Sequence, residues 1–441
     1  MIFDKKTPTA FIADFEKHAG RLNGGIPQWF NKSREEGRKR FEEHGVPTTK
    51  HEEWKYTDVN PILKHSFSMD QTGKPLDQQA FREYISKKDI NIVLVNGILS
   101  EELSGISRLP KGISVTALPE ALKTTGEEIK KVVDRFTPDL ETPFMALNQA
   151  LSKDGLFVNI DANTVSGELI HILHITSIPK GRTTFVAPRT IVSAGKSSEA
   201  TILESHIAFD NDSTYFVNAL TEADLAENAV LHYCKAQSES QKAYHIGGTR
   251  VYQERNSNFD SFSMMVGGEI TRNNIEIIVD GEGCDSTLDG LYSLGGKQLA
   301  DNHSAVDHRQ PNCTSNQLYK GILTGNSHTV FNGKIFVRPV AQLTNSYQLN
   351  KTLTLGDKCR VDTKPQLEIF ADDVKCTHGA TVGQLNEDEL FYLQTRCISL
   401  KKAVAMLAHG FVDDILSSLK NPAIVEKLNT LLRPSFERLD N

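Results

Sequence analysis

The middle of the chain, from about residue 156 to residue 376, consists of short runs of β-branched and aromatic residues separated by turn residues. The runs show almost no helical period, and this pattern predicts one strand after another. About 220 residues of strands without intervening helices fit a pair of sandwiched sheets, a propeller or a parallel β-helix. The clearest runs are 168–175, 200–207, 230–236, 275–279, 334–337 and 367–370.

Turn chemistry helps to distinguish these topologies. No Trp-Asp blade motif recurs, and Asn-Gly hairpin signals are scarce in the strand region, Asn332-Gly333 being the clearest. An earlier pair, Asn96-Gly97, ends an apolar run and also predicts a turn. Many strands carry Asn, His, Ser or Asp in mid-strand, where polar side chains of successive coils can stack on one another. We therefore favour stacked rungs over a two-sheet sandwich, although no exact repeat is present.

Helical patterns precede the strands. Thr7-Pro8 predicts the start of one helix, and a second is expected from Pro27 to Gly45. The second helix carries many charged residues of both signs. A mixed-sign run of this kind indicates a solvated helix face with i,i+4 ion pairs more often than a basic binding stripe.

Three short amphipathic helices are expected after the strands. Asn386 stands three residues before a Glu, close to a capping box, and Ser399 is expected to cap the next helix. The last helix is expected to follow Asn421-Pro422. Such a terminal set either packs wholly on the strand body or leaves an apolar groove for a partner, and we favour the packed arrangement.

These patterns divide the chain into four parts. An N-terminal helical domain is expected over 1–89, followed by a mixed connecting region over 90–155. The strand core is expected over 156–378 and a C-terminal helical domain over 379–441.

Composition narrows the class of protein. The 441 residues are 39% apolar and 24% charged, with 49 Lys+Arg against 56 Asp+Glu and a net charge of −7. This is an ordinary globular balance, and its mild acidity argues against a bulk electrostatic grip on nucleic acid or a membrane surface. Six widely spaced cysteines without a C-x-x-C pair argue against a disulfide framework or a structural zinc site. With neither a signal-peptide pattern nor an apolar run of spanning length, a cytoplasmic protein is expected.

One group of ionisable residues has the composition of a metal site. Asp301, His303, Asp307 and His308 supply two carboxylates and two imidazoles, enough for a divalent ion or an acid–base pair. Strand alternation places the first three on one face. We favour hydrogen bonding between neighbouring rungs, because no further ligand of suitable spacing follows.

A second group lies where the strands give way to helices. Cys376 and His378 are two residues apart, so in a strand their side chains point to the same side. A thiolate with an imidazole is a ligand set suited to iron or an iron–sulfur cluster. A buried Cys beside a turn His is the structural alternative, and spacing alone favours that alternative.

Common enzyme motifs are missing. The glycine-bearing segment 244–249 lacks the spacing of a P-loop, and G-x-S-x-G is absent, so the chain shows no nucleotidase or hydrolase signature of its own. A β-helix carbohydrate-active enzyme would need two carboxylates in one groove. Asp301 and Asp307 are the only attractive pair.

Several ordered segments resemble the SufB/SufD family of iron–sulfur cluster assembly scaffold proteins, and within it the SufD branch. The resemblance covers the strand body and the C-terminal helices well, and the N-terminal helices only through a Glu-Glu-Trp-Lys-Tyr-Thr segment. In SufB-like relatives the histidine that matches His378 is followed by Glu, whereas Gly379 follows here, which favours SufD. Cys397 stands where the family usually has Gly. The matching segments are 51–57, 301–303, 307–308, 319–323, 330–335, 364–369, 372–381, 390–393 and Arg396.

The resemblance implies a right-handed parallel β-helix flanked by helical N- and C-terminal domains. It implies a non-enzymatic scaffold that pairs with a SufB-like subunit through the β-helix edges and with the ABC ATPase SufC through the C-terminal helices. A nascent cluster would be built at the SufB–SufD junction, driven by ATP hydrolysis on SufC. No cofactor is expected on the isolated chain. The self-pairing edge of a β-helix leaves a homodimer open as the alternative to the heterodimer. A SufB-like subunit that carries the cluster itself is the alternative.

The resemblance also implies functions for individual residues. His378 belongs to the family's His-Gly-Ala-Thr motif, expected at the subunit junction, so His378 is the candidate metal ligand. Cys376 is the second candidate ligand for iron or a cluster. The residues expected to bind the partner through the C-terminal helices are Leu390, Phe391, Tyr392, Arg396, Leu407 and Phe411.

Overall fold

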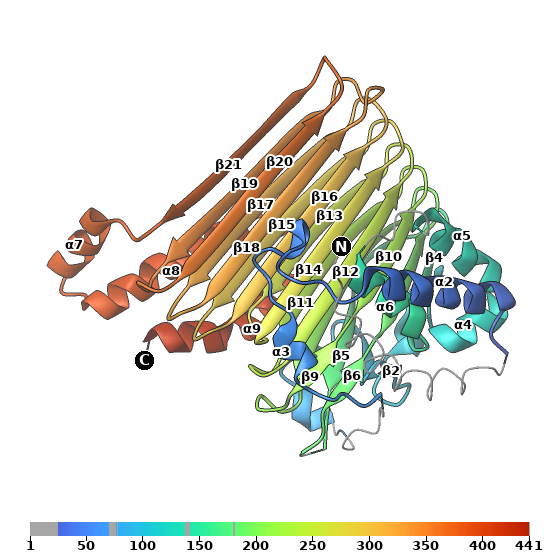
Figure 1. The fold of residues 1–441 in the computed structure, drawn as a ribbon, viewed down its shortest axis with the longest axis horizontal. Coiled ribbons are helices and arrows are strands. Elements are labelled where there is room, and N and C mark those ends of the chain that lie inside the picture. Colours follow the sequence, from blue (N-terminus) through green and yellow to red (C-terminus); the bar gives the residue numbers. More distant parts are fainter. Residues whose placement is uncertain (1–24, 70–75, 77, 137–141, 180, 441) are drawn as a thin grey trace.

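The structure, a computed structural model, describes residues 25–69, 76, 78–136, 142–179 and 181–440. The helix expected from Thr7 lies outside the described residues. Two long sheets face each other, and from β4 onward the chain runs mostly from one sheet to the other and back, so that it coils as a parallel β-helix (Figure 1). Hydrogen-bonded neighbours in one sheet are about 30 residues apart, as where Ile270 pairs with Leu299. The prediction of stacked rungs is confirmed.

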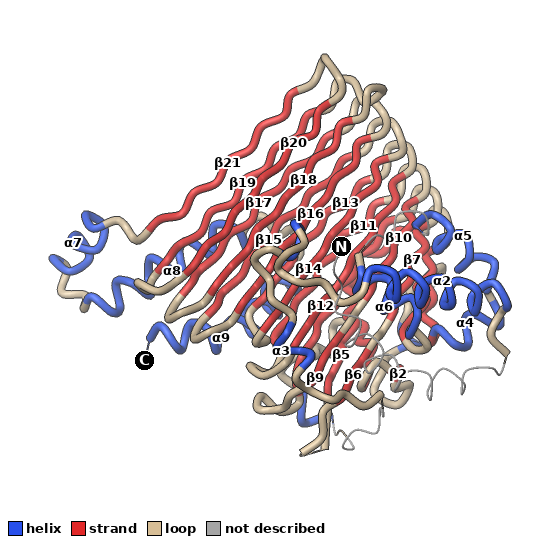
Figure 2. Tube along the Cα trace, viewed as in Figure 1, coloured by secondary structure: helices blue, strands red, loops and turns tan. Residues whose placement is uncertain are grey.

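Nearly all pairs in both sheets are parallel, and the antiparallel pairs β1–β2 and β3–β4 stand at the N-terminal end. Strands make up the body of the molecule, and the helices lie around it (Figure 2). The first sheet has the order β2 (Ile98–Leu99), β1 (Ile90–Val95), β5 (Val165–Thr176), β8 (Glu199–Ala208), β11 (Val230–Ser238), β13 (Asn258–Met265), β15 (Asp285–Leu294), β17 (Thr314–Leu323), β19 (Asn345–Thr354), β21 (Lys375–Gly383). The second has β20 (Arg360–Ile369), β18 (His328–Val337), β16 (Leu299–His308), β14 (Ile270–Val279), β12 (Tyr244–Gln253), β10 (Leu220–Leu225), β7 (Arg189–Ala194), β4 (Gly155–Ile160), β3 (Ile113–Ala117). Off this path, β9 (Tyr215–Val217) pairs with β12, and β6 (Thr184–Val186) pairs with β9.

The main core lies between the two sheets. Inward-facing side chains such as Ile172, Ile202 and Val251 are completely buried there. Most strands before β19 are also buried on their outer faces, because helices cover both sheets. Apolar residues therefore occur on both faces of some strands, in short runs such as 277–279.

Helices cover the outer faces in two groups. The C-terminal helices α8 and α9 pack on β11, β15 and β17 of the first sheet, whereas the N-terminal helices lie on the second sheet (Figure 1). No helix in the described ranges is long and apolar enough to cross a membrane. The helices are α2 (Gln28–His44), η2 (Glu52–Trp54), α3 (Asn60–Leu63), η3 (Gln78–Phe81), η4 (Ile106–Arg108), α4 (Leu118–Thr124), α5 (Gly126–Phe136), α6 (Pro143–Leu151), α7 (Glu387–Thr395), α8 (Leu400–Leu416) and α9 (Pro422–Asp440).

Local punctuation predicted from the sequence is confirmed at several helix ends. Helix α2 ends before Gly45, whose backbone has a φ of 68°. Asn386 accepts a hydrogen bond from the backbone N–H of Asp388, and Ser399 accepts one from that of Lys402. These caps satisfy N–H groups that have no partner inside the helix.

The turn predicted at Asn96-Gly97 is confirmed, whereas the hairpin signal at Asn332-Gly333 marks no turn. Asn96 and Gly97 have φ values of 51° and 85° and join the antiparallel strands β1 and β2. Asn332-Gly333, by contrast, lies in the middle of β18. A Cβ atom at Gly333 would lie 1.9 Å from Nε2 of Gln348, so this glycine leaves room for a buried side chain of the neighbouring sheet rather than making a turn.

Candidate functional site

The last turn of the β-helix is open. Strands β20 and β21 end their sheets, and within the described residues no strand pairs with the outer edge of either. Both are markedly more exposed than the strands before them. A free strand edge presents unpaired N–H and C=O groups and is a template for pairing with another chain.

Hydrogen-bond direction identifies which residues face this edge. The N–H of Lys375 donates to the carbonyl of Thr344 at 2.9 Å, toward β19. Because parallel strands bond alternately to either side, the N–H groups of Cys376, His378 and Ala380 face the free edge. The corresponding set on β20 includes Pro365, which has no N–H to offer, and proline is tolerated at an edge for that reason.

The structure brings Cys376 and His378 to one face of β21. They lie in register with Ser346 and Gln348 of β19, both of which are buried between the sheets. The Cys376 and His378 side chains therefore continue the inward-facing column to the open end. His378 is exposed, whereas Cys376 packs partly against a small apolar cluster that includes Ile335. Burial raises the pKa of the Cys376 thiol, so the thiolate needed for metal binding is disfavoured in the isolated chain.

Helix α7 contains three of the six residues expected to bind a partner, and Arg396 follows it directly. It projects from the body next to the end of β21 (Figure 1), and none of its residues is buried. Phe391 and Tyr392 are 69% and 57% exposed. The guanidinium of Arg396 lies 5.2 Å from the ring centre of Tyr392, and Leu390 is half-buried. Two exposed aromatic side chains with an arginine are the residue types that dominate protein interfaces.

Helix α8 contributes less exposed surface than its sequence suggested. Leu407 and Phe411 are both half-buried. The Phe411 carbonyl accepts a hydrogen bond from buried Lys320 at 3.1 Å, and the Lys320 ammonium lies 4.6 Å from the Phe411 ring centre. Phe411 therefore packs on the β-helix. Leu400 and Met406, which the sequence analysis did not select, are the more exposed apolar residues of this helix.

Cys397 follows α7 with a φ of 63°, in the left-handed region where glycine is usual. The turn thus keeps the backbone conformation that a glycine would adopt, although the residue differs. Cys397 is exposed and forms no disulfide.

The Asp301 group is structural, as the sequence analysis favoured. Buried Asp301 accepts a hydrogen bond from Arg272 at 2.7 Å and lies 2.9 Å from His303. Asp307 pairs with Arg338, which follows the neighbouring strand β18, at 2.7 Å. His308 turns inward and lies 2.9 Å from Ser315. Because both carboxylates are held by arginines, they do not form the free acid–base pair of a glycoside hydrolase.

Asp301 also anchors the N-terminal Glu-Glu-Trp-Lys-Tyr-Thr segment, which we call the strap (residues 52–57). Thr57 donates a hydrogen bond to Asp301, and the Arg272 guanidinium stacks 3.7 Å from the Trp54 ring centre. Glu53 forms ion pairs with His303 and Lys334, from β16 and β18. The strap therefore crosses the outer face of the second sheet toward its open end, which explains a motif that the sequence could not place.

We expect the strap to detach as the solution becomes acidic. The bond with His303 and the Lys334 charge lower the pKa of Glu53 to about 2, and Arg272 and His303 outweigh burial to hold the pKa of Asp301 at about 2. Lowered pKa values in the folded state stabilise it above the unfolded values, and this stability is lost as pH falls from about 4.5 toward 2. Trp54 fluorescence during acid titration measures the release. Wild type should have a higher free energy of unfolding than Glu53→Gln near neutral pH, and this difference should shrink as pH falls through the same window. A difference that does not change with pH would contradict the lowered pKa of Glu53.

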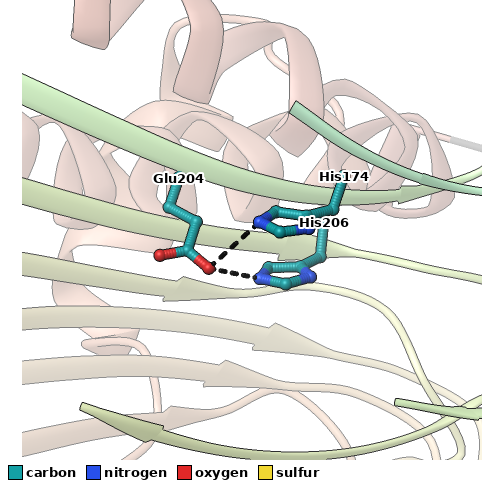
Figure 3. Close-up of side chains that lie close together, drawn as sticks. All are labelled: His174, Glu204 and His206. Atoms are coloured by element: carbon teal, nitrogen blue, oxygen red, sulfur yellow. Dashed lines mark hydrogen bonds and ion pairs between the residues drawn. The ribbon is translucent and has the colours of Figure 1, made fainter. Parts of the chain in front are cut away.

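One group of three metal-ligating side chains occurs in the described part of the chain, and the sequence analysis missed it. His174, Glu204 and His206 lie side by side inside the β-helix (Figure 3). The alternation of His206 with Glu204 was visible in the sequence, but His174 joins them only through the register of β5 and β8.

The fold and its open end define the class of protein: a parallel β-helix whose last strands, β20 and β21, have one edge unpaired within the described residues. Residues 176–411 match the family model for the SUF system FeS cluster assembly SufBD core domain, and residues 5–172 match that for the SufBD protein N-terminal region. The chain therefore belongs to the SufBD family of iron–sulfur cluster assembly proteins.

Its relatives agree. A SufBD family iron–sulfur cluster assembly protein of Synechocystis is 32% identical over 85% of this chain and 84% of its own length. The iron–sulfur cluster assembly protein SufD of Escherichia coli is 28% identical over 92% of this chain and 95% of its own length. The chloroplastic protein ABCI7 of Arabidopsis thaliana is 28% identical over 86% and 80%.

Proposed function

We propose that this protein is a SufD-like scaffold subunit of a SufBCD complex. In this proposal a SufB-like subunit pairs with the free edges of β20 and β21, and a nascent iron–sulfur cluster is assembled at that junction. The observation that carries the proposal is the position of His378, exposed on an unpaired edge strand with its side chain on the inward face. A partner strand at this edge would bring its own ligands beside the His378 imidazole.

The chemistry of the open end supports a solenoid as the partner. Strand edges of about ten residues in both sheets are costly to leave unpaired, and a similar β-helix would continue both sheets at once. Exposed apolar side chains at the same end, including Ile369, Phe370 and Val382, would be buried in the process. In the absence of the SufB-like subunit, a second copy of this chain is the natural competitor for the edge.

We further propose that α7 and the exposed start of α8 bind a SufC-like ABC ATPase. Phe391, Tyr392 and Arg396 remain in this proposal because they are exposed, and Leu390 remains because it is half-buried beside them. Phe411 is better explained as a contact between α8 and the β-helix. Since α7 directly follows β21, movement of a bound ATPase would act on the strand that carries the proposed ligands.

The test is reconstitution of the cluster on the assembled complex with the His378→Ala variant. Cluster yield, measured as bound iron and sulfide, is expected to fall at least about tenfold while the complex still assembles, because the imidazole is a first-row metal ligand. His44→Ala, which removes an exposed histidine from the far end of α2, is the matched control. Wild-type yield from an intact His378→Ala complex would remove His378 from the mechanism.

The alternative function, a SufB-like subunit that itself carries the cluster, is tested by reconstituting the isolated chain. Our proposal expects iron and sulfide to stay near background on the lone chain. Stoichiometric cluster on the lone chain, lost in the Cys376→Ser variant, would favour the alternative.

A further inference from the structure

A buried group of polar side chains lies inside the β-helix, far along the chain from the open end. His174 of β5 and His206 of β8 occupy register-paired positions, and their rings stack with centres 4.3 Å apart. Glu204 lies two residues before His206, on the same inward face. His174 is 5% exposed, Glu204 1% and His206 2% (Figure 3).

Their ligand atoms converge on a small volume. Oε1 of Glu204 lies 3.3 Å from Nε2 of His174 and 3.1 Å from Nε2 of His206. The three atoms lie within 4.8 Å of one another. Metal–ligand bonds of about 2.1 Å at tetrahedral or octahedral angles place neighbouring ligand atoms about 3 to 3.5 Å apart. Two of the contacts already have this spacing.

Hydrogen bonds to its second oxygen fix the orientation of the Glu204 carboxylate. Its other oxygen, Oε2 of Glu204, accepts hydrogen bonds from Thr221 at 2.8 Å and from the Tyr233 hydroxyl at 2.6 Å. These bonds leave Oε1 directed toward the two imidazoles. Outer hydrogen bonds that orient a ligating carboxylate are a regular feature of protein metal sites.

The polar atoms of the group are not satisfied by the protein alone. Neither ring nitrogen of buried His174 makes a hydrogen bond, although Nε2 approaches Glu204. The ammonium of Lys235, register neighbour of Glu204 on β11, is also buried and makes no hydrogen bond. Buried polar groups without protein partners are rare in folded proteins, and a bound water or ion usually satisfies them. Lys235 therefore forms no hydrogen bond with Oε1, which contacts the two imidazoles.

From this geometry we propose that His174, Glu204 and His206 bind one divalent transition-metal ion inside the β-helix. Both Fe²⁺ and Zn²⁺ are bound in proteins by two imidazoles and one carboxylate. A cysteine ligand is therefore not required at this site. The site is separate from His378 and does not depend on the function proposed for the open end.

The proposal is tested on the full chain without a polyhistidine tag, produced in medium supplemented with Co²⁺, Fe²⁺ or Zn²⁺ so that a buried site is loaded during folding. Wild type is expected to retain about one metal equivalent after gel filtration, measured by mass spectrometry of the elements. Glu204→Gln and His174→Asn are expected to lose at least about tenfold in occupancy. His171→Asn is the matched control, because His171 is buried on the same strand but binds Ser205 on the other face.

Crystals of the cobalt-loaded wild type supply a second measurement that needs no variant. An anomalous peak between the three side chains is expected. Occupancy below about a tenth of an equivalent in the folded wild type, equal occupancy in Glu204→Gln, or an anomalous peak elsewhere would overturn the proposal. If Glu204→Gln does not fold, the anomalous map alone decides.

Discussion

The Ala380→Pro variant is expected to fold like the wild-type chain but to lose its proposed SufB-like subunit. The N–H of Ala380 faces the free edge of β21, so proline removes no hydrogen bond within the chain, as at Pro365 of β20. An approaching strand, however, loses one donor and meets the pyrrolidine ring. We expect affinity to fall about tenfold or more, measured by titration of the purified subunits.

Two neighbouring variants make this prediction specific. Ala380→Ser keeps the N–H and should bind like wild type. Thr381→Pro removes a donor that faces β19, and should instead lower the unfolding midpoint of the chain itself. Undiminished binding by a folded Ala380→Pro chain would mean that the partner does not pair along β21.

The second large effect concerns the buried pair of Arg272 and Asp301. Replacing Asp301 with alanine leaves the Arg272 guanidinium, whose side chain is 2% exposed, without its carboxylate. Removing one partner of such a pair costs about 3–5 kcal/mol, because the remaining charge stays buried. Thr57 of the strap loses its acceptor in the same step. We therefore expect Asp301→Ala to lower the free energy of unfolding by that amount and to loosen the strap, followed by circular dichroism and Trp54 fluorescence in denaturant.

Asp307 on the same strand is the matched control. Its partners Arg309 and Arg338 are 33% and 47% exposed, so Asp307→Ala leaves both charges accessible to water. Exposed ion pairs contribute about 1 kcal/mol or less. Equal losses in the two variants would show that Arg272 relaxes to solvent and that burial is not the source of the cost.

Much of the local structure was predictable because it depends on neighbours in sequence. The caps at Asn386 and Ser399 and the turn at Asn96-Gly97 were each predicted from a few adjacent residues. Asn332-Gly333 has the same local signature but makes no turn, since its glycine leaves room for Gln348 from the other sheet. A pattern of adjacent residues shows that a glycine is present, but it does not show whether a turn or a close-packed side chain requires that glycine.

The sequence by itself determined that strands dominate the middle of this protein, and that Cys376 and His378 share a face, because side chains alternate along any strand. Only the tertiary structure decided that this face lies at an open end, and that His174 meets His206 from a strand of another turn. It alone placed Glu53 against Lys334, 281 residues away. The physical reason is that the register between turns depends on the length of every connecting loop and on packing between sheets, which no local pattern records.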